Sequence, residues 1–420
     1  MPSREIIAGL LQNGRQAVVQ GQYDRAIGLF RRVQTGYPGA PEEPEATLLL
    51  TQVYEKKGEL LQALTEYRRL ANEFSQAPQT TLARTKIPEL ERQLPVVRPP
   101  GTPIVGLHMG PDDLAALDDH GLDRLRRSGT NTLIVNVARD RTVATGGEKV
   151  GVYFKTDWAP VLQDRLSAVV AAAHRQGLQV WASLSVRRLD WLDPKLDWAD
   201  RKFSAQTARL ERTETMDLLH PALRDYLVGL LTDLAGTGVD GLFLVADPPS
   251  TASEGFSASA LRQFERDMGR PVDPSRLLSV QGRERSPSYA PEFWRWLGWK
   301  QREQSKSVIG VMEAVRAAFP GLMVAVEVHP EAVTNPQAAL ALYAEDLLDL
   351  KRYRVDYIAV SVPPAQGAVA IKAAEIVRER LLLLVDPTDK NSVPVSALPA
   401  GSGLIYKEKP SQMRLTNQGG

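Results

Sequence analysis

Polar side chains follow nearly every short apolar run in the second part of the chain. They are His108, Arg139, Asp140, Arg187, Arg188, Asp190, Asp247, Glu254, Glu327, His329, Ser361, Asp386 and Lys407. The longest intervening segments carry aromatic residues, which are Trp191, Trp198, Tyr289, Trp294, Trp296 and Trp299. Acids beside aromatic faces suit a sugar, because a sugar ring stacks on an indole while carboxylates bind its hydroxyl groups.

Short apolar runs precede these polar residues and predict the strands that position them. The runs cover 104–109, 132–137, 179–186, 241–246, 323–328, 357–362, 381–386 and 403–407. They are apolar on both faces, which is typical of parallel strands that helices cover from outside. Eight such strands with helices between them predict a (β/α)8 barrel of the TIM type. In this fold the chemistry lies at the carboxyl ends of the strands, where the polar residues follow.

Amphipathic segments between the runs predict the covering helices. They span 113–127, 158–176, 221–235, 292–319 and 336–351. An open, doubly wound sheet is the alternative arrangement for such a pattern. Neither GxGxxG nor GxxxxGK[ST] follows the first run, so a nucleotide site has no support. His174 lies near the end of one predicted helix, where we expect it to face solvent.

The first 94 residues follow a helical period and contain a repeat. A turn glycine, a small residue and an aromatic residue recur at matching offsets, as Gly21, Ala26 and Phe30 and then as Gly58, Ala63 and Tyr67. The small residue lets two helices approach closely, and the glycine closes the turn between them. The pattern resembles tetratricopeptide repeats, which present a concave face to a protein partner. A helical bundle that only packs against the second module is the alternative, since such arrays usually need roughly three repeats.

Proline marks the boundary between the two modules. The segment 95–103 contains four prolines, which hold the backbone extended and deny it helical hydrogen bonds. We therefore predict helical repeats at 1–94, a Pro-rich linker at 95–103 and a barrel at 104–410. The last ten residues, 411–420, are predicted to be a disordered tail.

The composition is that of a globular protein without a strong electric field. Hydrophobic residues make up 43% and charged residues 24% of the 420 residues. Lys and Arg number 51 and Asp and Glu number 50, so nothing attracts the chain to nucleic acid. No stretch reaches the apolar length of a membrane span. Cysteine is absent, which excludes disulfides and thiolate catalysis.

Four longer strings carry a resemblance to a known family. They are TNTLIVNVARD (130–140), HPALRDYLVGLLTDLAGTGVDGLFLVADPPSTASEG (220–255), FWRWLGWKQREQSKSVIGVMEAVRAAFP (293–320) and VHPEAVTNPQAALALYAEDLLDLKRYRVDYIAVSVP (328–363). In this order they resemble the C-terminal hydrolase domain of PgaB-type proteins, which process the exopolysaccharide poly-β-1,6-N-acetylglucosamine. The likeness covers about residues 100–408, and helical repeats stand where that family has a deacetylase domain. It implies a glycoside-hydrolase-like barrel that acts on or binds a β-linked amino-sugar polymer, with the repeats recruiting a protein partner.

The acidic motif of that family is only partly present. Its fourth strand ends in a His-Asp-Asp run, whereas this chain has Asp247 and, farther on, Glu254. The resemblance therefore implies Asp247 as general acid, with Glu254 or Asp140 as its partner. Glycoside hydrolysis usually needs two carboxyl groups across the scissile bond, although hexosaminidases can use the N-acetyl group of the substrate instead of one. A glycosidase of different specificity and a degenerate barrel that only binds glycan are the alternatives.

Four further residues are expected to bind the sugar, and no cofactor is expected. The four are Arg139, Trp294, His329 and Asn335. His108, Glu327 and His329 are the nearest approach to a metal-binding set, but His108 lies far from the other two, so we predict no metal site.

The location of the protein in the cell is left open by two opposing features. The resemblance implies an envelope protein. The N-terminal sequence MPSREIIAGLLQNGRQ lacks a basic segment followed by about 7–15 apolar residues, which favours the cytoplasm. An upstream start codon would resolve this conflict in favour of the envelope.

Overall fold

The computed structural model of the chain consists of two compact units, Met1–Pro95 and Val96–Gly420. It describes residues 2–93, 102–110, 113, 117–141, 149–193, 196–204, 206–246, 252–278, 291–364, 366–386 and 398–407. Most of the predicted linker and the whole predicted tail lie outside these residues. Among the helices in these ranges, none is both long and apolar enough to cross a membrane.

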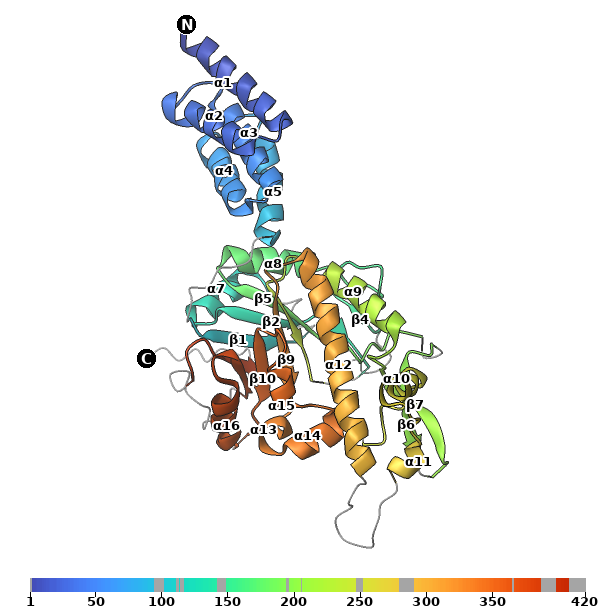
Figure 1. Ribbon diagram of the computed structural model, residues 1–420. Coiled ribbons are helices and arrows are strands. Elements are labelled where there is room, and N and C mark those ends of the chain that lie inside the picture. Colours follow the sequence, from blue (N-terminus) through green and yellow to red (C-terminus); the bar gives the residue numbers. More distant parts are fainter. Residues whose placement is uncertain are drawn as a thin grey trace, which may run out of the picture. The chain divides into compact units, whose positions relative to one another are not determined.

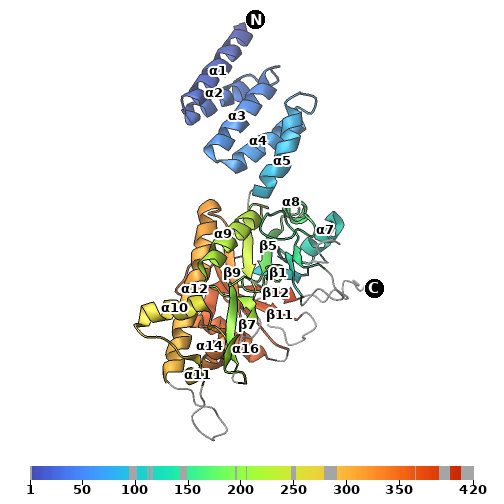
Figure 2. The same cartoon turned by 90° about the vertical axis from the view of Figure 1, so that its right-hand side faces the viewer.

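The first unit is built entirely from antiparallel helices that pack on one another in chain order (Figure 2). They are α1 (Pro2–Val19), α2 (Tyr23–Gly36), α3 (Glu43–Lys57), α4 (Leu60–Glu73) and α5 (Thr80–Gln93). Gly21 and Gly58 adopt φ angles of 70° and 78°, which fit glycine at the turns that follow α1 and α3. The helical prediction for this module is confirmed.

The repeated residues form the core of this helical unit. Ala26 and Ala63 are fully buried, and so are Phe30 and Tyr67 one turn farther along. Gly14 of α1 lies against the Phe30 ring, and a Cβ there would lie 2.6 Å from the ring carbon Cζ. The small residues therefore allow close helix packing, and the rings fill the space that remains.

Eight parallel strands close the barrel of the second unit (Figure 1). They are β1 (Ile104–Met109), β2 (Thr132–Asn136), β5 (Gln179–Leu184), β8 (Gly241–Leu244), β9 (Met323–Val328), β10 (Tyr357–Ser361), β11 (Leu381–Val385) and β12 (Gly403–Lys407). Neighbours around the barrel follow chain order, and β12 closes the ring by pairing with β1. The predicted (β/α)8 fold and its eight strands are confirmed.

Apolar side chains fill the barrel interior, and we call them the barrel plug. They are Ile104, Ile134, Trp181, Phe243, Ala325, Ala359, Leu382, Leu384 and Ile405. A larger core lies between the strands and the surrounding helices. At Gly403 the two strands that close the ring meet tightly, because a Cβ there would lie 2.5 Å from the carbonyl oxygen of Ile104. The plug leaves room for polar groups only at the strand ends.

The barrel helices include α12, which runs along the barrel wall in Figure 1. They are α7 (Asp119–Arg127), α8 (Leu166–Arg175), α9 (Pro221–Ala235), α10 (Ala258–Met268), α11 (Pro274–Leu277), α12 (Pro291–Ala318), α13 (Glu331–Thr334), α14 (Pro336–Tyr343), α15 (Leu347–Leu350) and α16 (Gly367–Val377), followed by the 3₁₀ turn η1 (Arg378–Arg380).

Three predicted helices are shorter in the structure. In the segment 113–127, α7 begins only at Asp119, after its cap Asp118. The segment 158–176 becomes helical only at the start of α8, because the residues before it pair with Val152, whose carbonyl oxygen accepts the Leu162 amide at 2.8 Å. The segment 336–351 is divided into α14 and α15. Its break lies at Ala344, where φ is 53° in the left-handed region.

Two antiparallel hairpins that the sequence pattern did not predict leave the barrel. One joins β3 (Ala138–Arg139) to β4 (Gly151–Val152), and the other joins β6 (Ala199–Ser204) to β7 (Arg209–Met216). The second hairpin lies beside α10 and α11 in Figure 1. Both hairpins follow strand ends, so they bring extra residues to the barrel mouth.

His174 corrects the expectation of a solvent-exposed helix end. Its Nε2 lies 2.8 Å from Asp240 Oδ2, and its side chain is only 4% exposed. The same carboxylate oxygen accepts the Val180 amide at 2.8 Å. This histidine therefore secures the amino end of the barrel strands, away from the mouth.

Candidate functional site

Polar side chains close the barrel interior just beyond the plug. Glu327, Ser361 and Lys407 each lie two residues after a plug residue on β9, β10 and β12. The Ser361 hydroxyl donates to Glu327 Oε1 at 2.7 Å, and Lys407 Nζ donates to Ser361 Oγ at 2.7 Å. Lys407 Nζ also lies 3.5 Å from Glu327 Oε1, while the Ala246 amide donates to Oε2 at 3.2 Å. Donors thus face both oxygens, and Glu327 acts as an acceptor.

The ring of His108 lies in the same layer, and it is neutral. Burial lowers the pKa of His108 to about 4; the nearby Glu327 carboxylate opposes that shift and Lys407 adds to it. Its Nε2 lies 3.2 Å from the Ser183 hydroxyl. A neutral imidazole beside a hydroxyl can hold a hydrogen-bond pattern but takes up no proton at neutral pH.

A cavity opens to solvent beside Glu327, and we call it the mouth cavity. The ends of β8 and β9, the middle of α12 and the residues after α14 enclose it. Its polar lining consists of Arg187, Gln301, Gln304, Ser305, Glu327, His329, Tyr343, Glu345 and Asp346. Concave sites with a few polar groups among apolar side chains are typical of small-ligand binding.

A stacked pair forms one wall of the mouth cavity. The rings of His329 and Tyr343 are 3.6 Å apart and nearly parallel, at 10°. Glu345 fixes the imidazole, since its carboxylate accepts the backbone amide of His329 at 2.9 Å and lies 2.8 Å from Nδ1. Burial lowers the pKa of His329, but the Glu345 hydrogen bond and charge outweigh it, so the pKa is raised overall.

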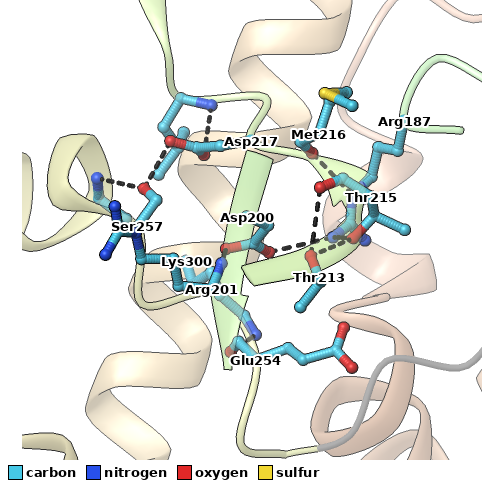
Figure 3. Close-up of polar contacts among 12 residues, drawn as sticks. Arg187, Asp200, Arg201, Thr213, Thr215, Met216, Asp217, Glu254, Ser257 and Lys300 are labelled. Atoms are coloured by element: carbon cyan, nitrogen blue, oxygen red, sulfur yellow. Dashed lines mark hydrogen bonds and ion pairs between the residues drawn. The ribbon is translucent and has the colours of Figure 1, made fainter. Parts of the chain in front are cut away.

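A buried charge cluster lies beside the mouth cavity (Figure 3). It contains Arg187, Asp200, Asp217 and Lys300, each at most 5% exposed. Arg187 Nη2 lies 3.2 Å from Asp200 Oδ2, and it also donates to the Thr215 hydroxyl at 3.3 Å. Because Arg187 also lines the mouth cavity, the cluster reaches the cavity wall through its guanidinium.

Burial shifts the ionisation of three groups in this cluster, Lys300, Asp200 and Asp217. Burial lowers the pKa of Lys300 to about 8, although the Asp200 carboxylate opposes the shift. Burial also raises the pKa of Asp200, against the pull of Arg187 and Lys300. For Asp217, burial and the neighbouring Asp200 raise the pKa to about 6. Such shifts are common where a fold keeps charges for a specific task.

The three acids predicted to be catalytic come from separate segments of the chain. Asp247 lies outside the described residues. Glu254 lies in the segment before α10, where its backbone carbonyl accepts Lys300 Nζ at 3.0 Å. Asp140 is half-buried just after the short strand β3. Neither Glu254 nor Asp140 lines the mouth cavity.

Of the four residues predicted to bind sugar, the structure places one in the cavity wall, His329. Arg139 pairs with Gly151 in the first hairpin, and its guanidinium carbon lies 5.6 Å from the centre of the Tyr153 ring. Trp294 packs edge-on against Phe293 in the apolar cluster between α10 and α12. The fourth residue is exposed and caps α14, since Asn335 Oδ1 accepts the Ala338 amide at 3.1 Å.

Glu327, Ser361 and Lys407 were named from the sequence as strand ends but were not selected as site residues. Their signal is the two-residue period of a strand, because each follows an inward-facing apolar residue by two positions. Glu345 and Tyr343 carry no such signal, since they reach the cavity through the break between α14 and α15. Within the described residues, no group of three His, Asp or Glu side chains forms a metal site.

Comparison with known proteins bears on the fold of the barrel. The PgaB (BpsB) glycoside hydrolase domain from Bordetella bronchiseptica aligns with 73% of this chain and 94% of its own, at 18% identity and a TM-score of 0.56. The barrel has a glycoside-hydrolase-like fold. A cold-adapted β-galactosidase from Rahnella sp. R3 aligns with 74% of this chain and 51% of its own, at 13% identity and a TM-score of 0.46.

A β-mannanase from the blue mussel Mytilus edulis also matches, over 73% of this chain and 87% of its own, at 12% identity and a TM-score of 0.37. At these identities the likeness concerns the fold, and the chemistry has to be argued from this chain's own residues. No family model and no curated protein matches the sequence.

Proposed function

We propose that this protein binds a β-linked amino-sugar polymer, of the poly-β-1,6-N-acetylglucosamine kind, at the mouth of its barrel. The mouth cavity supports this most, because three carboxyl groups line it together with the stacked rings of His329 and Tyr343. An aromatic face with a few placed acceptors suits a sugar ring and its hydroxyl groups. The glycoside-hydrolase-like fold supports the same class of ligand by analogy.

The charge of the cavity favours an amino sugar over a neutral sugar. Glu327, Glu345 and Asp346 line it. Lys407 balances Glu327, His329 lies against Glu345, and the Arg187 guanidinium is paired with Asp200, so the carboxylates still outnumber the cations that face the cavity. A deacetylated sugar carries a protonated amine, which gains from a surplus of carboxylates in a partly enclosed site. A neutral sugar gains only hydrogen bonds there.

Hydrolysis is the further part of the proposal. Asp247 is the proposed general acid, with Glu254 or Asp140 as the second carboxyl group. Retention needs about 5–5.5 Å between two such groups and inversion roughly 6.5–9.5 Å. On an N-acetylated unit the acetamido group of the substrate replaces the second carboxyl group, so one acid suffices.

Glycan binding without cleavage is the second candidate function. Glu327 already accepts hydrogen bonds from the Ser361 hydroxyl and the Ala246 amide, so both of its oxygens are engaged within the fold. Among the described residues, neither Glu254 nor Asp140 faces the cavity. This arrangement favours holding a sugar over breaking its glycosidic bond.

The helical unit is proposed to recruit a protein partner as a pair of tetratricopeptide-like repeats. Two hairpins with buried Ala26 and Ala63 at equivalent positions support this, as do Phe30 and Tyr67 beside them. An exopolysaccharide or biofilm system of the cell envelope is the setting that these two modules together suggest.

Partially deacetylated β-1,6-glucosamine oligomers test both functions. Incubation with the full chain, followed by mass spectrometry, detects cleavage, and calorimetry detects binding. Cleavage that is lost in Asp247→Asn but kept in Glu313→Gln, an exposed acid on α12, supports the hydrolase. Binding without cleavage that weakens in Glu327→Gln supports the glycan-binding protein. A chain that neither binds nor cleaves these oligomers contradicts the proposal.

A further inference from the structure

Lys300 of α12 places an ammonium group in the interior, only 2% exposed, where it serves the backbone of another segment. Its Nζ donates to the Glu254 carbonyl oxygen at 3.0 Å. Figure 3 shows the Lys300 side chain ending between Asp200 and the Glu254 backbone, with the Glu254 carboxylate pointing away from the cluster. The lysine thus holds the backbone of Glu254, and the Glu254 carboxylate also attracts the ammonium group.

The segment around Glu254 is shaped to receive this lysine. Gly255 has a φ of 99°, in the left-handed region that favours glycine. A Cβ at Gly255 would lie 2.5 Å from Lys300 Cδ and 2.9 Å from Nζ. Any other residue at this position therefore displaces the lysine or moves the segment.

The same segment is joined to the β6–β7 hairpin by backbone hydrogen bonds. The Arg201 carbonyl oxygen accepts the Gly255 amide at 3.1 Å and the Phe256 amide at 2.9 Å, and the Phe203 amide donates to the Ser253 carbonyl at 2.8 Å. Next to Arg201, the Asp200 carboxylate attracts Lys300 and pairs with Arg187. Lys300 therefore interacts with both the hairpin, through Asp200, and the segment that carries Glu254.

We infer that Lys300 is a positioning residue that fixes Glu254 and the β6–β7 hairpin at the barrel mouth. A purely structural role explains a charged residue poorly, because an apolar side chain of similar volume often stabilises a protein as well or better. An ammonium group, unlike a methylene chain, gives a directed hydrogen bond to one carbonyl oxygen and an attraction to one carboxylate. The role of Glu254 toward the sugar rests on the proposed function, whereas the positioning of the segment by Lys300 does not.

Hydrogen exchange of the full chain at pH 7 tests the positioning itself, without any sugar. Lys300→Met keeps the length of the side chain and removes both its charge and its donor groups. We expect exchange in residues 252–257 to rise about tenfold, the size expected for loss of a charged hydrogen bond. Lys306→Met, an exposed lysine on the same helix paired with Glu303, is the matched control and leaves this segment unchanged. Unaltered exchange at 252–257 in Lys300→Met overturns the inference.

Gly255→Ala gives a second route to the same result, because it disturbs the contact while the lysine remains. It is expected to raise exchange in 252–257 as well, and an unchanged segment in a folded Gly255→Ala protein likewise overturns the inference.

A double-variant cycle tests whether Lys300 acts through Glu254. If it does, Lys300→Met slows oligomer cleavage in the wild-type background but adds no further loss to Glu254→Gln. Additive losses overturn the positioning of Glu254. A wild-type chain that cleaves no oligomer contradicts the proposed hydrolysis instead, and the exchange experiment then still decides whether Lys300 positions the segment.

Discussion

At the scale of single residues, the mouth cavity depends on how Glu345 holds His329. The hydrogen bond and the charge of Glu345 keep the pKa of His329 raised in spite of burial. Replacing Glu345 with Gln removes the charge and keeps an acceptor, so we predict a lower pKa for His329. NMR titration of the imidazole resonances measures this, with Glu313→Gln as control. A titration that does not move in Glu345→Gln would show that the stacked geometry alone sets the ionisation.

The buried amine of Lys300 predicts an unusual dependence of stability on pH. In the folded protein Lys300 loses its proton at about pH 8, against 10.5 for an ordinary lysine. Between these values the unfolded chain binds more protons, so the free energy of unfolding rises with pH, by at most about 1.4 kcal/mol per unit.

Urea denaturation at several pH values compares the wild type with Lys300→Met, which lacks this ionisation. The free energy of unfolding of the wild type is expected to gain on that of the variant as the pH rises above about 8. Below about pH 8, the ionisation of Lys300 is expected to leave the difference in the free energy of unfolding between the two proteins constant. A difference that is constant, or that shrinks with rising pH, contradicts a lowered pKa for this lysine.

At the scale of elements, one crowded glycine tests the barrel closure, and one glycine in open space provides the comparison. Gly403→Ala places a methyl group 2.5 Å from the carbonyl oxygen of Ile104, so it pushes β12 away from β1. We predict a loss of about 1–3 kcal/mol or more in the free energy of unfolding, as for overpacked cores. Gly310 lies in the exposed middle of α12 with no atom near its Cβ position. Gly310→Ala should stabilise the protein by up to about 1 kcal/mol.

Denaturant unfolding of both variants provides the measurement, and each variant serves as the control for the other. A Gly403→Ala protein as stable as the wild type would contradict the close approach of the two strands.

The elements were predictable from sequence where burial alone decides their pattern. The eight strands are apolar on both faces, and this pattern does not depend on what lies at their ends. The β6–β7 hairpin alternates charges instead of apolar residues, so it carries no strand signal. Position 344 is an alanine in the left-handed region, and nothing in the local sequence marks such a break.

At the scale of the whole molecule, the two units have separate apolar cores and should unfold separately. Phe30→Ala removes a fully buried ring from the helical unit, at a cost of about 3–5 kcal/mol. Calorimetry of the full chain should show one transition lowered in this variant and a different one lowered in Gly403→Ala. Val19→Ala, at an exposed position, should lower neither. A single transition that both core variants lower would contradict independent units.

The site was less predictable than the fold, for a physical reason. Inward-facing polar groups such as Glu327 follow from strand period, whereas Glu345 and Tyr343 reach the cavity only because a helix breaks nearby. Asn335 shows the reverse case, since a polar residue after a strand serves as a helix cap. The positions of the strands in the sequence therefore locate the barrel mouth, but they do not indicate which polar residues face it.

We propose that the barrel mouth binds an amino sugar through its surplus of carboxylates. Calorimetric titration of the full chain with two β-1,6-linked oligomers, one partially deacetylated and one fully N-acetylated, tests it most directly. We predict about tenfold tighter binding of the deacetylated oligomer, or about 1.4 kcal/mol, and loss of that preference in Glu327→Gln/Glu345→Gln but not in Glu313→Gln. Equal affinity for the two oligomers, or a preference that survives the double substitution, would contradict the claim.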